Sequence, residues 1–238
     1  MTRAKHSRWA HLIFDIYLWW AFRRHFNAFH LLGELPKPDP KLPLILVPNH
    51  STWWDGFFVH FLNKRYLGRP LYLMMLEEQL QKYKFFSRVG AYGIEPDNSK
   101  SILKSLNYTT KVLKQSQSPF PTVCIFPQGE LQPWGKRPLD FKSGIDWVIK
   151  KYQKPINILL LCIRCEYLQQ QKPGVFFLFN KNYVFDVDTF PGNKWLEEIE
   201  EVLLDDLNQR IAEGKTGQLL LNGSRSVNQK MDRVLGRG

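Results

Sequence analysis

Short apolar runs that alternate with amphipathic segments constrain the fold of this chain more than any other feature of its sequence. Three runs have the length and apolar character of buried strands: 42–50 (LPLILVPNH), 121–130 (PTVCIFPQGE) and 156–167 (INILLLCIRCEY). Amphipathic helices are predicted between and after these runs, at 99–117, 141–152 and 193–214. Strands that alternate with helices predict an α/β fold in which helices flank a mixed sheet.

The remaining segments suggest how the chain is organised. Residues 172–185 predict one or two further strands. The Pro-rich stretch 34–43 predicts a linker, so we expect a membrane-interface helix within residues 1–35 and the main domain at 36–214. The polar, basic residues 215–238 predict a frayed tail. The helix at 193–214 is expected to turn one apolar face inward, with Trp195, Ile199, Val202, Leu203, Leu207 and Ile211.

The N-terminal segment 8–32 lacks Gly and Pro and predicts one long helix. Its most apolar part, Leu12 to Phe22, would span only about 16 Å as a helix, which is too short to cross a bilayer. Its Trp side chains and the Arg23–Arg24 pair are typical of the headgroup interface, although packing on the domain core is the alternative. We therefore expect a membrane-associated protein.

The chain carries 33 Lys and Arg against 22 Asp and Glu, a net charge of +11 that suggests an anionic partner. Nucleic acid is not expected, because no helix-turn-helix, zinc-finger or RNA-recognition motif is present. A membrane surface is the better match for the aromatic helix. The chain also lacks GxSxG, GxGxxG and P-loop motifs, which argues against a serine hydrolase and against nucleotide cofactors.

The three cysteines do not suggest a disulfide framework, and no secretory signal is recognisable, so we expect the protein to face the cytoplasm. Cys162 and Cys165 have CxxC spacing within a predicted buried strand. Residues three apart on a strand point to opposite faces. We therefore interpret both as core residues and expect no metal site.

The segment NHSTWWDG (49–56) places His50 directly after a strand and Asp55 five residues later. Ligands commonly bind where strands of an α/β sheet turn into helices. Across a tight turn the Asp55 carboxylate can accept a hydrogen bond from Nδ1–H of the imidazole, which leaves Nε2 free to act as a base. A structural histidine held by an acid remains the alternative.

A second polar loop, FPQGE (126–130), follows another predicted strand. The NHxxxxD and FPxG motifs, in this order and followed by FKSG (141–144), resemble the glycerolipid acyltransferase family, which includes the lysophosphatidic acid acyltransferases. The resemblance covers roughly residues 40 to 165. It implies an acyltransferase-like fold and transfer of an acyl group from acyl-CoA or acyl carrier protein to a lipid hydroxyl, with no metal or bound cofactor.

By this resemblance His50 is the general base, Asp55 orients it, and the FPxG loop helps to bind a 1-acylglycerol-3-phosphate-like acceptor. The chain departs from the family where FPEGTRS becomes FPQGELQ, because Leu131 replaces the Arg that binds the acceptor phosphate. Glu95 and Pro96 likewise stand where an Arg is expected. The candidate substrate-binding residues are Gln128, Gly129, Glu130, Lys136, Arg137 and Lys142.

The lost Arg leaves two alternatives open. In the first alternative, the same chemistry acts on a neutral lipid alcohol, such as a glycolipid or a carotenoid glycoside. In the second alternative, the chain keeps the fold but not the catalytic activity and is a basic membrane-binding protein. The tryptophans nearest the motifs, Trp53, Trp54 and Trp134, are interpreted either as a lining for sugar or acyl groups or as core residues.

Overall fold

A computed structural model describes residues 1–224, and within them one mixed sheet of nine strands forms the centre of the molecule. The strand order is β4-β3-β5-β2-β6-β7-β1-β9, with β8 paired to β6. The strands are β1 (Ala28–Leu31), β2 (Leu44–Pro48), β3 (Leu71–Leu76), β4 (Ala91–Ile94), β5 (Thr122–Cys124), β6 (Ile156–Glu166), β7 (Gly174–Phe179), β8 (Tyr183–Phe185) and β9 (Gln218–Asn222). The predicted α/β fold with a mixed sheet is confirmed.

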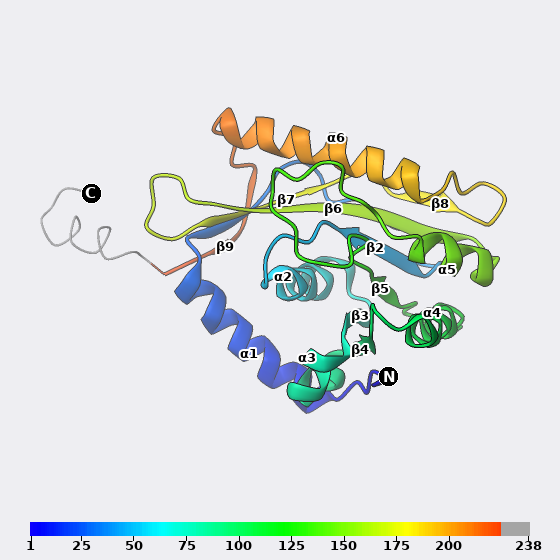
Figure 1. Cartoon of the computed structure of the whole chain (residues 1–238). Helices are drawn as coiled ribbons and strands as arrows, with labels where there is room; N and C mark the ends of the chain where they lie inside the picture. Colours follow the sequence, from blue (N-terminus) through cyan, green and yellow to red (C-terminus); the bar gives the residue numbers. More distant parts are fainter. Residues whose placement is uncertain (225–238) are drawn as a thin grey trace, which may run out of the picture.

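Helices cover both faces of this sheet (Figure 1). On one face, α4 (Ser99–Leu113), α5 (Gly144–Tyr152) and α6 (Asn193–Ala212) pack over one buried cluster. On the other, α1 (Arg8–His25), α2 (Asp55–Leu62) and the 3-10 helix η2 (Lys84–Val89) pack over a second. The short α3 (Glu77–Lys82) follows β3, and the π-helix η1 (Asn63–Leu67) follows α2.

The strands β2 to β5 are parallel to their neighbours, so their carboxyl ends lie at one edge of the sheet. β6 continues this arrangement beside β2. The strands beyond it mix directions, because β7 is antiparallel to β6 and β9 is antiparallel to β1. The parallel half therefore gathers the loops after β2, β3, β4 and β5 at a common edge, where α/β folds usually bind ligands.

Two predicted boundaries are wrong. The helix predicted over 8–32 ends at His25, and Ala28–Leu31 forms β1, which pairs with β7 and β9. The tail predicted from residue 215 contains β9, while residues 225–238 lie outside the described part. Both errors have the same cause. The sequences of β1 and β9 do not alternate apolar and polar residues as a strand usually does, and these strands form because they pair with neighbours in the sheet.

The helical face predicted for 193–214 also needs one correction. Val202 is 68% exposed, whereas Glu200 is fully buried. Burial raises the pKa of the Glu200 carboxyl well above its usual range, which favours the protonated acid beneath the sheet.

The α1 helix is apolar on two sides, so it packs on the domain and also exposes an apolar surface. One side packs on the domain through Ala10, Phe14, Leu18, Ala21 and Phe22. The other side, which we call the exposed α1 face, carries Trp9, Leu12, Ile13, Ile16, Tyr17, Trp19 and Trp20. Arg23 lies over the Trp19 ring at 4.9 Å, and Arg24 lies over the Trp20 ring at 5.2 Å. No helix among residues 1–224 combines the length and hydropathy that a bilayer crossing requires.

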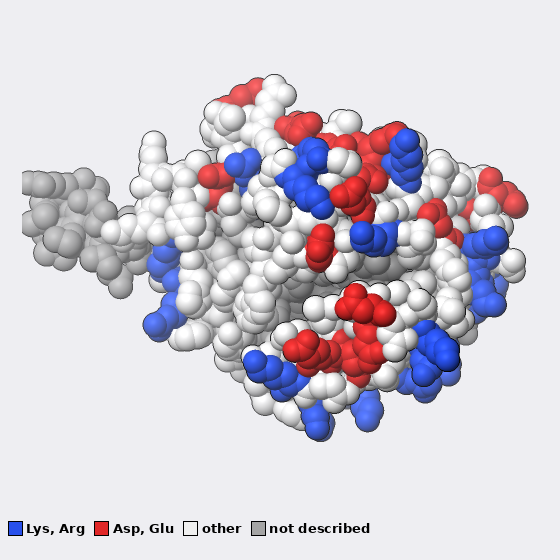
Figure 2. Space-filling model, in the orientation of Figure 1, with Lys and Arg blue, Asp and Glu red and all other residues white. Residues whose placement is uncertain are grey.

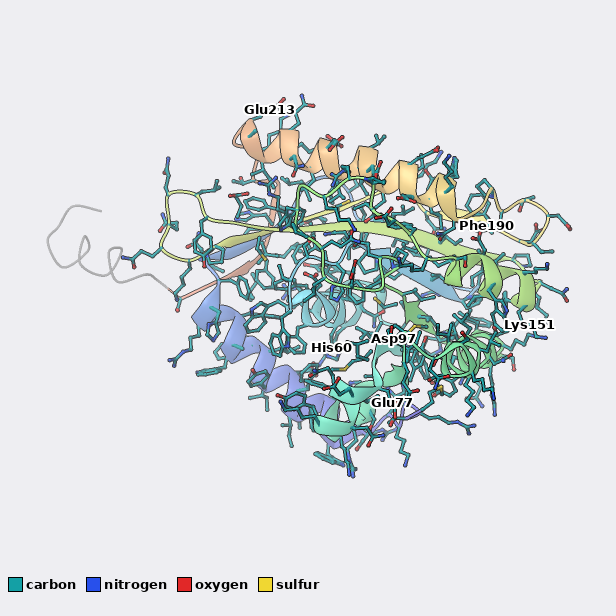
Figure 3. All side chains as sticks on the ribbon, in the orientation of Figure 1. His60, Glu77, Asp97, Lys151, Phe190 and Glu213 are labelled. Atoms are coloured by element: carbon teal, nitrogen blue, oxygen red, sulfur yellow. The ribbon has the colours of Figure 1, made fainter. Side chains whose placement is uncertain are left out.

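Three histidines pack between α1, its preceding segment and α2, where Figure 3 labels His60. His6 Nδ1 lies 3.0 Å from His11 Nε2, and the His11 ring stacks on that of His60 at 5.8 Å. His60 in turn contacts the carboxylate of Asp15 at 3.0 Å. Partial burial of the ring, followed by the proximity of His11 and His60, lowers the pKa of His6 to about 4, while much of the residue stays exposed to solvent.

This histidine cluster predicts that the protein loses stability in mild acid. The folded-state pKa of His6 lies below the unfolded value of 6.5, so its contribution is complete above pH 6.5 and is lost as the pH falls toward 4. We expect Tm to fall by roughly 3–6 °C over this range from His6 alone, after allowing for solvent screening. The His6→Gln variant, measured by thermal denaturation at the same pH values, should show a smaller fall. An identical fall in both proteins would contradict the prediction.

Candidate active site

The two motif loops meet because the strands that precede them are neighbours. β2 and β5 pair in parallel, with Leu46 opposite Cys124. The loop after β2 therefore brings His50 to the same edge of the sheet as the loop after β5, which holds Gly129. The imidazole of His50 stacks on Phe126, with the ring centroids 4.2 Å apart. One catalytic candidate thus contacts the second motif directly.

The predicted contact between His50 and Asp55 is present. His50 Nδ1 lies 3.0 Å from Asp55 Oδ2. The carboxylate side chain is 1% exposed, whereas the His50 side chain is 24% exposed. When Nδ1–H donates to the carboxylate, Nε2 keeps a lone pair for an approaching proton. The pair therefore combines a buried orienting acid with a partly accessible base.

Asp55 also organises the turn between β2 and α2. Its Oδ2 accepts hydrogen bonds from the backbone N–H groups of Ser51 at 2.7 Å and Thr52 at 2.8 Å. Its Oδ1 accepts from the Thr52 hydroxyl at 2.6 Å. A carboxylate at the first position of α2 is favoured by the helix dipole as well. The five-residue spacing in the motif therefore follows from this closed turn.

The backbone of His50 is fixed by two glutamines of the second loop. The His50 N–H donates to Gln128 Oε1 at 2.5 Å, and the Gln132 N–H donates to the His50 carbonyl at 2.9 Å. Gln128 Nε2 donates to Gln132 Oε1 at 2.6 Å, which closes the ring. Both side chains are buried. The Gln128 side chain therefore holds the His50 backbone, and its predicted contact with substrate stays a prediction.

Sequence reasoning missed two residues at this site. Gln132 carries no motif signal, since it contacts His50 only because the loop folds back. Asn49 precedes His50, and its side chain joins β2 to β6: Asn49 Nδ2 donates to the Ile163 carbonyl at 3.2 Å, and Asn49 Oδ1 accepts from the Ile163 N–H at 2.7 Å. The sequence could have indicated Asn49, because it is the first residue of the NHxxxxD motif.

The Gln128 contact yields a test of positioning. Gln128→Leu removes the acceptor for the His50 N–H and is expected to lower kcat by about 10- to 100-fold, because a buried donor is left unpaired beside the base. Gln128→Glu keeps that acceptor, and the Gln132 amide, whose Nε2 has no partner, can turn to donate to it. The glutamate variant should therefore stay within about threefold of wild type. Equal losses in both variants would contradict this assignment.

The other predicted substrate-binding residues divide into two groups. The charges of Lys136 and Arg137 are already matched: Lys136 lies 3.1 Å from Asp140 and 3.9 Å from Glu130, and Arg137 lies 3.3 Å from Asp205. Glu130 is largely exposed and points to this lysine.

Gly129 and Lys142 form the second group and lie together. Gly129 has φ of +76°, a conformation that favours glycine, and the Lys142 stem would be 3.5 Å from a Cβ at this position. The Lys142 N–H donates to the Pro127 carbonyl, which ties the start of FKSG to the loop. Among residues 1–224, the Lys142 ammonium has no ion pair.

The face of the molecule that carries the loop after β5 is hollowed at its centre (Figure 2). Acidic side chains gather on one rim of this hollow. That rim lies near α3 and the end of β4. This segment includes Glu95 and Asp97, the region where the resemblance leads one to expect an Arg. Of the three motif tryptophans, Trp53 is 61% exposed, whereas Trp54 and Trp134 pack on the two buried clusters.

The CxxC pair lies as predicted on β6, with its two side chains on opposite faces of the sheet. Cys162 packs in the cluster beneath α6, and Cys165 packs against the cluster beneath α1 and α2. Burial raises the pKa of the Cys165 thiol to about 12, so this thiol stays protonated at neutral pH. No three His, Cys, Asp or Glu side chains within the described residues are grouped to hold a metal ion.

Comparisons with known proteins place this geometry in a family. The fold is similar to the crystal structure of the 1-acyl-sn-glycerophosphate (LPA) acyltransferase PlsC from Thermotoga maritima, with a TM-score of 0.53 and 18% sequence identity over 85% of this chain and 78% of that chain. No curated protein matches the sequence. The acyltransferase family model matches residues 28–159, which include both motif loops and exceed half of the 238 residues. The chain therefore belongs to the acyltransferase family.

Proposed function

We propose that this protein transfers a fatty acyl group from acyl-CoA or acyl carrier protein to a hydroxyl of a lipid acceptor. The observation that carries the proposal is the His50–Asp55 pair, with its 3.0 Å contact, partly exposed base and buried acid. The oxygen of the acceptor hydroxyl attacks the thioester carbonyl while His50 Nε2 takes the hydroxyl proton. A C–O bond forms, the C–S bond breaks, and the thiol leaves after receiving that proton.

We further propose that the acceptor is a neutral lipid alcohol, in preference to the lysophosphatidate-like acceptor that the motifs imply. Two arrangements support this choice. Lys136 and Arg137 already have carboxylate partners, and Leu131 offers no charge to a phosphate, so that among the predicted substrate-binding cations only Lys142 lacks an ion pair within residues 1–224. One rim of the hollow also carries acidic side chains, which repel a phosphate and accept hydrogen bonds from hydroxyl groups, whereas the facing rim carries both basic and acidic side chains.

The test is thiol release from acyl-CoA and from acyl carrier protein with a panel of acceptors. The panel compares lysophosphatidate with monoacylglycerol and with a glycolipid of the same chain length. We expect the uncharged acceptors to react at least about tenfold faster, given the phosphate repulsion. A preference for lysophosphatidate would reject the neutral acceptor and leave acyl transfer standing. Absence of thiol release with every acceptor would reject the proposed function itself.

We propose that the exposed α1 face docks the protein on a membrane surface. Seven large apolar side chains face outward from one helix, and two of its tryptophans carry an arginine over the ring. Trp rings beside Arg guanidinium groups are typical of the headgroup interface.

The membrane proposal predicts a large loss of vesicle binding when two of these rings are removed. Trp19→Ser with Trp20→Ser should weaken binding to phosphatidylcholine vesicles about 100-fold, since each half-exposed Trp buries apolar area worth roughly 1.5 kcal/mol. Sedimentation with vesicles measures the change. Val202→Ser removes an exposed apolar side chain from α6, on the opposite face of the sheet (Figure 1), and serves as the control. Unchanged binding of the double variant would exclude this docking surface.

A further inference from the structure

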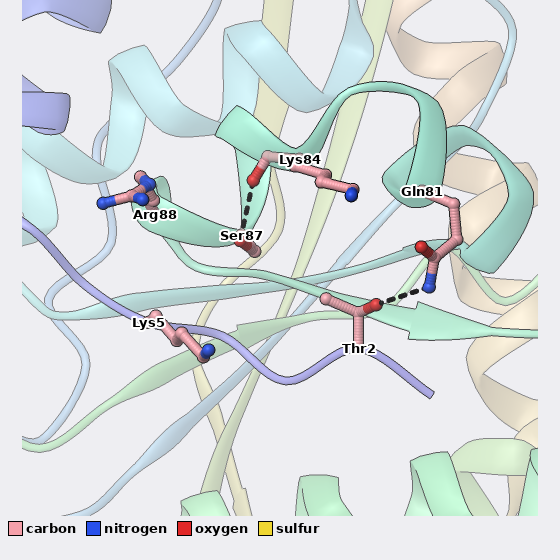
Figure 4. A pocket seen from close by; sticks show the side chains of 6 residues that line it. All are labelled: Thr2, Lys5, Gln81, Lys84, Ser87 and Arg88. Atoms are coloured by element: carbon pink, nitrogen blue, oxygen red, sulfur yellow. Dashed lines mark hydrogen bonds between the residues drawn. The ribbon is translucent and has the colours of Figure 1, made fainter.

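We infer that a pocket beside the start of α1 binds the phosphate of an anionic phospholipid, separately from the acyl-transfer site. The pocket has a volume of about 320 Å³. It lies between the segment that precedes α1 and the α3–η2 region (Figure 4). No residue of the loops 49–55 or 125–143 lines it; the lining residues are Thr2, Lys5, Gln81, Lys84, Ser87 and Arg88.

Positive charge dominates this pocket. The ammonium groups of Lys5 and Lys84 come from opposite sides of it (Figure 4), and neither has an ion pair within residues 1–224. Arg88 is a third basic residue of the lining, and its guanidinium lies over the neighbouring Trp9 ring. One carboxylate, Glu77, lies at the border, where it accepts hydrogen bonds from Thr2 and Gln81. Two lysine ammonium groups and a nearby guanidinium against one carboxylate favour an anion, and the hydroxyl and amide groups of the wall supply additional donors.

The walls of the pocket are fixed before any ligand arrives. The Lys5 N–H donates to the Ser87 carbonyl at 2.7 Å, and the Ser7 N–H donates to the Arg88 carbonyl at 2.9 Å. Thr2 adds a third tie, since its carbonyl accepts from the Gly93 N–H at 2.9 Å. The N-terminal segment is thereby held along η2 and the end of β4. Binding would order few further groups, which reduces its entropic cost.

The position of the pocket selects a lipid phosphate as the anion. Arg88 lies 5.2 Å from the Trp9 ring, and Trp9 contacts Phe85 with ring centroids 6.3 Å apart. Trp9 is half exposed and is the first large ring of the exposed α1 face. The cations therefore adjoin the apolar surface that we propose for membrane docking. Lipid phosphates lie at the level where interfacial Trp side chains sit, next to the acyl chains.

The test compares binding of the full-length protein to two kinds of vesicle: phosphatidylcholine alone, and phosphatidylcholine with 20% phosphatidate (about one lipid in five, to supply a surface charge). Lys5→Ala with Lys84→Ala should weaken binding to the anionic vesicles about tenfold and leave binding to neutral vesicles unchanged. Lys150→Ala with Lys151→Ala removes the same charge from α5, where Figure 3 labels Lys151, and should change neither. Thiol release with a detergent-dispersed acceptor should be equal in all three proteins.

Three results would overturn the inference. Equal losses in the pocket variant and the α5 variant would mean that only net charge matters. Wild-type binding by the pocket variant would exclude the pocket. Inhibition of vesicle binding by soluble glycerol 3-phosphate at or below the phosphatidate concentration would indicate a soluble anion as the ligand. The inference relies on membrane docking by α1 and is independent of catalysis, since vesicle binding is measured even if no acceptor is acylated.

Discussion

Replacing His50 with Ala is expected to lower kcat about 10²- to 10⁴-fold, the range that a positioned general base contributes. The imidazole is a partly exposed base that contacts both motif loops, through Asp55 and Phe126. Without it, no group takes the proton of the attacking hydroxyl. KM for the acceptor should change little, because the ring acts on the proton in the transition state. Initial rates of thiol release with the best acceptor of the panel measure the effect.

The variant must remain folded for this result to be informative. The His50 side chain is partly exposed, so its removal leaves a small space at the surface and Tm should stay within about 3 °C of wild type. His25→Ala is the matched control, because it removes an exposed histidine from the end of α1. Its turnover should equal that of wild type. If His50→Ala retains full turnover, another group is the base and the proposed mechanism fails.

Replacing Asp55 with Asn is expected to reduce both activity and stability. Asp55 accepts four hydrogen bonds, from the His50 ring, two backbone N–H groups and the Thr52 hydroxyl. An asparagine amide offers one oxygen and one NH₂ group, so at least one of these donors would meet another donor. The imidazole then loses the contact that fixes its tautomer. We expect kcat to fall about 10²- to 10⁴-fold, on the scale observed when a buried orienting carboxylate is neutralised.

The stability effect of the Asp55 change distinguishes it from His50→Ala. A buried donor left without an acceptor costs about 1–3 kcal/mol, which corresponds to a Tm decrease of roughly 3–10 °C in a chain of this size. Thermal denaturation and thiol release should therefore both decline for Asp55→Asn. Thr52→Val provides the comparison, because it removes only the 2.6 Å hydroxyl contact and keeps the carboxylate. A fully active, fully stable Asp55→Asn protein would show that the carboxylate does not orient the base.

Much of the fold was predictable because local pattern and tertiary environment agree. The apolar runs that became β2, β5 and β6 are buried on both faces, and the amphipathic runs that became α4, α5 and α6 each cover one face of the sheet. The segment β3-α3-β4 was not predicted. Its strands are short, and Gly90 and Gly93 interrupt the pattern, so it is specified mainly by pairing with β5 and by contacts with the N-terminal segment.

The sequence by itself predicted which residues of the candidate site lie together. The two motifs, each after a predicted strand, carried the family resemblance that grouped His50, Asp55 and Gly129, and the structure brings His50 and Asp55 into contact at the edge where β2 and β5 end. This succeeded because the groups are close in sequence or follow neighbouring strands. Hydrogen bonds between residues that are close in sequence require a fixed spacing, which can be recognised in the sequence.

Only the tertiary structure decided the roles of groups that meet through folding. The Gln128 side chain accepts a hydrogen bond from the His50 backbone, which the sequence did not indicate, and the charges of Lys136 and Arg137 are matched by partners as far away in sequence as Asp205. The cationic pocket likewise joins residues 2–5 to residues 81–88. The physical reason is common to all three cases. Burial and charge pairing depend on which side chains from distant segments of the chain lie close together in the fold. A local sequence pattern does not contain that information.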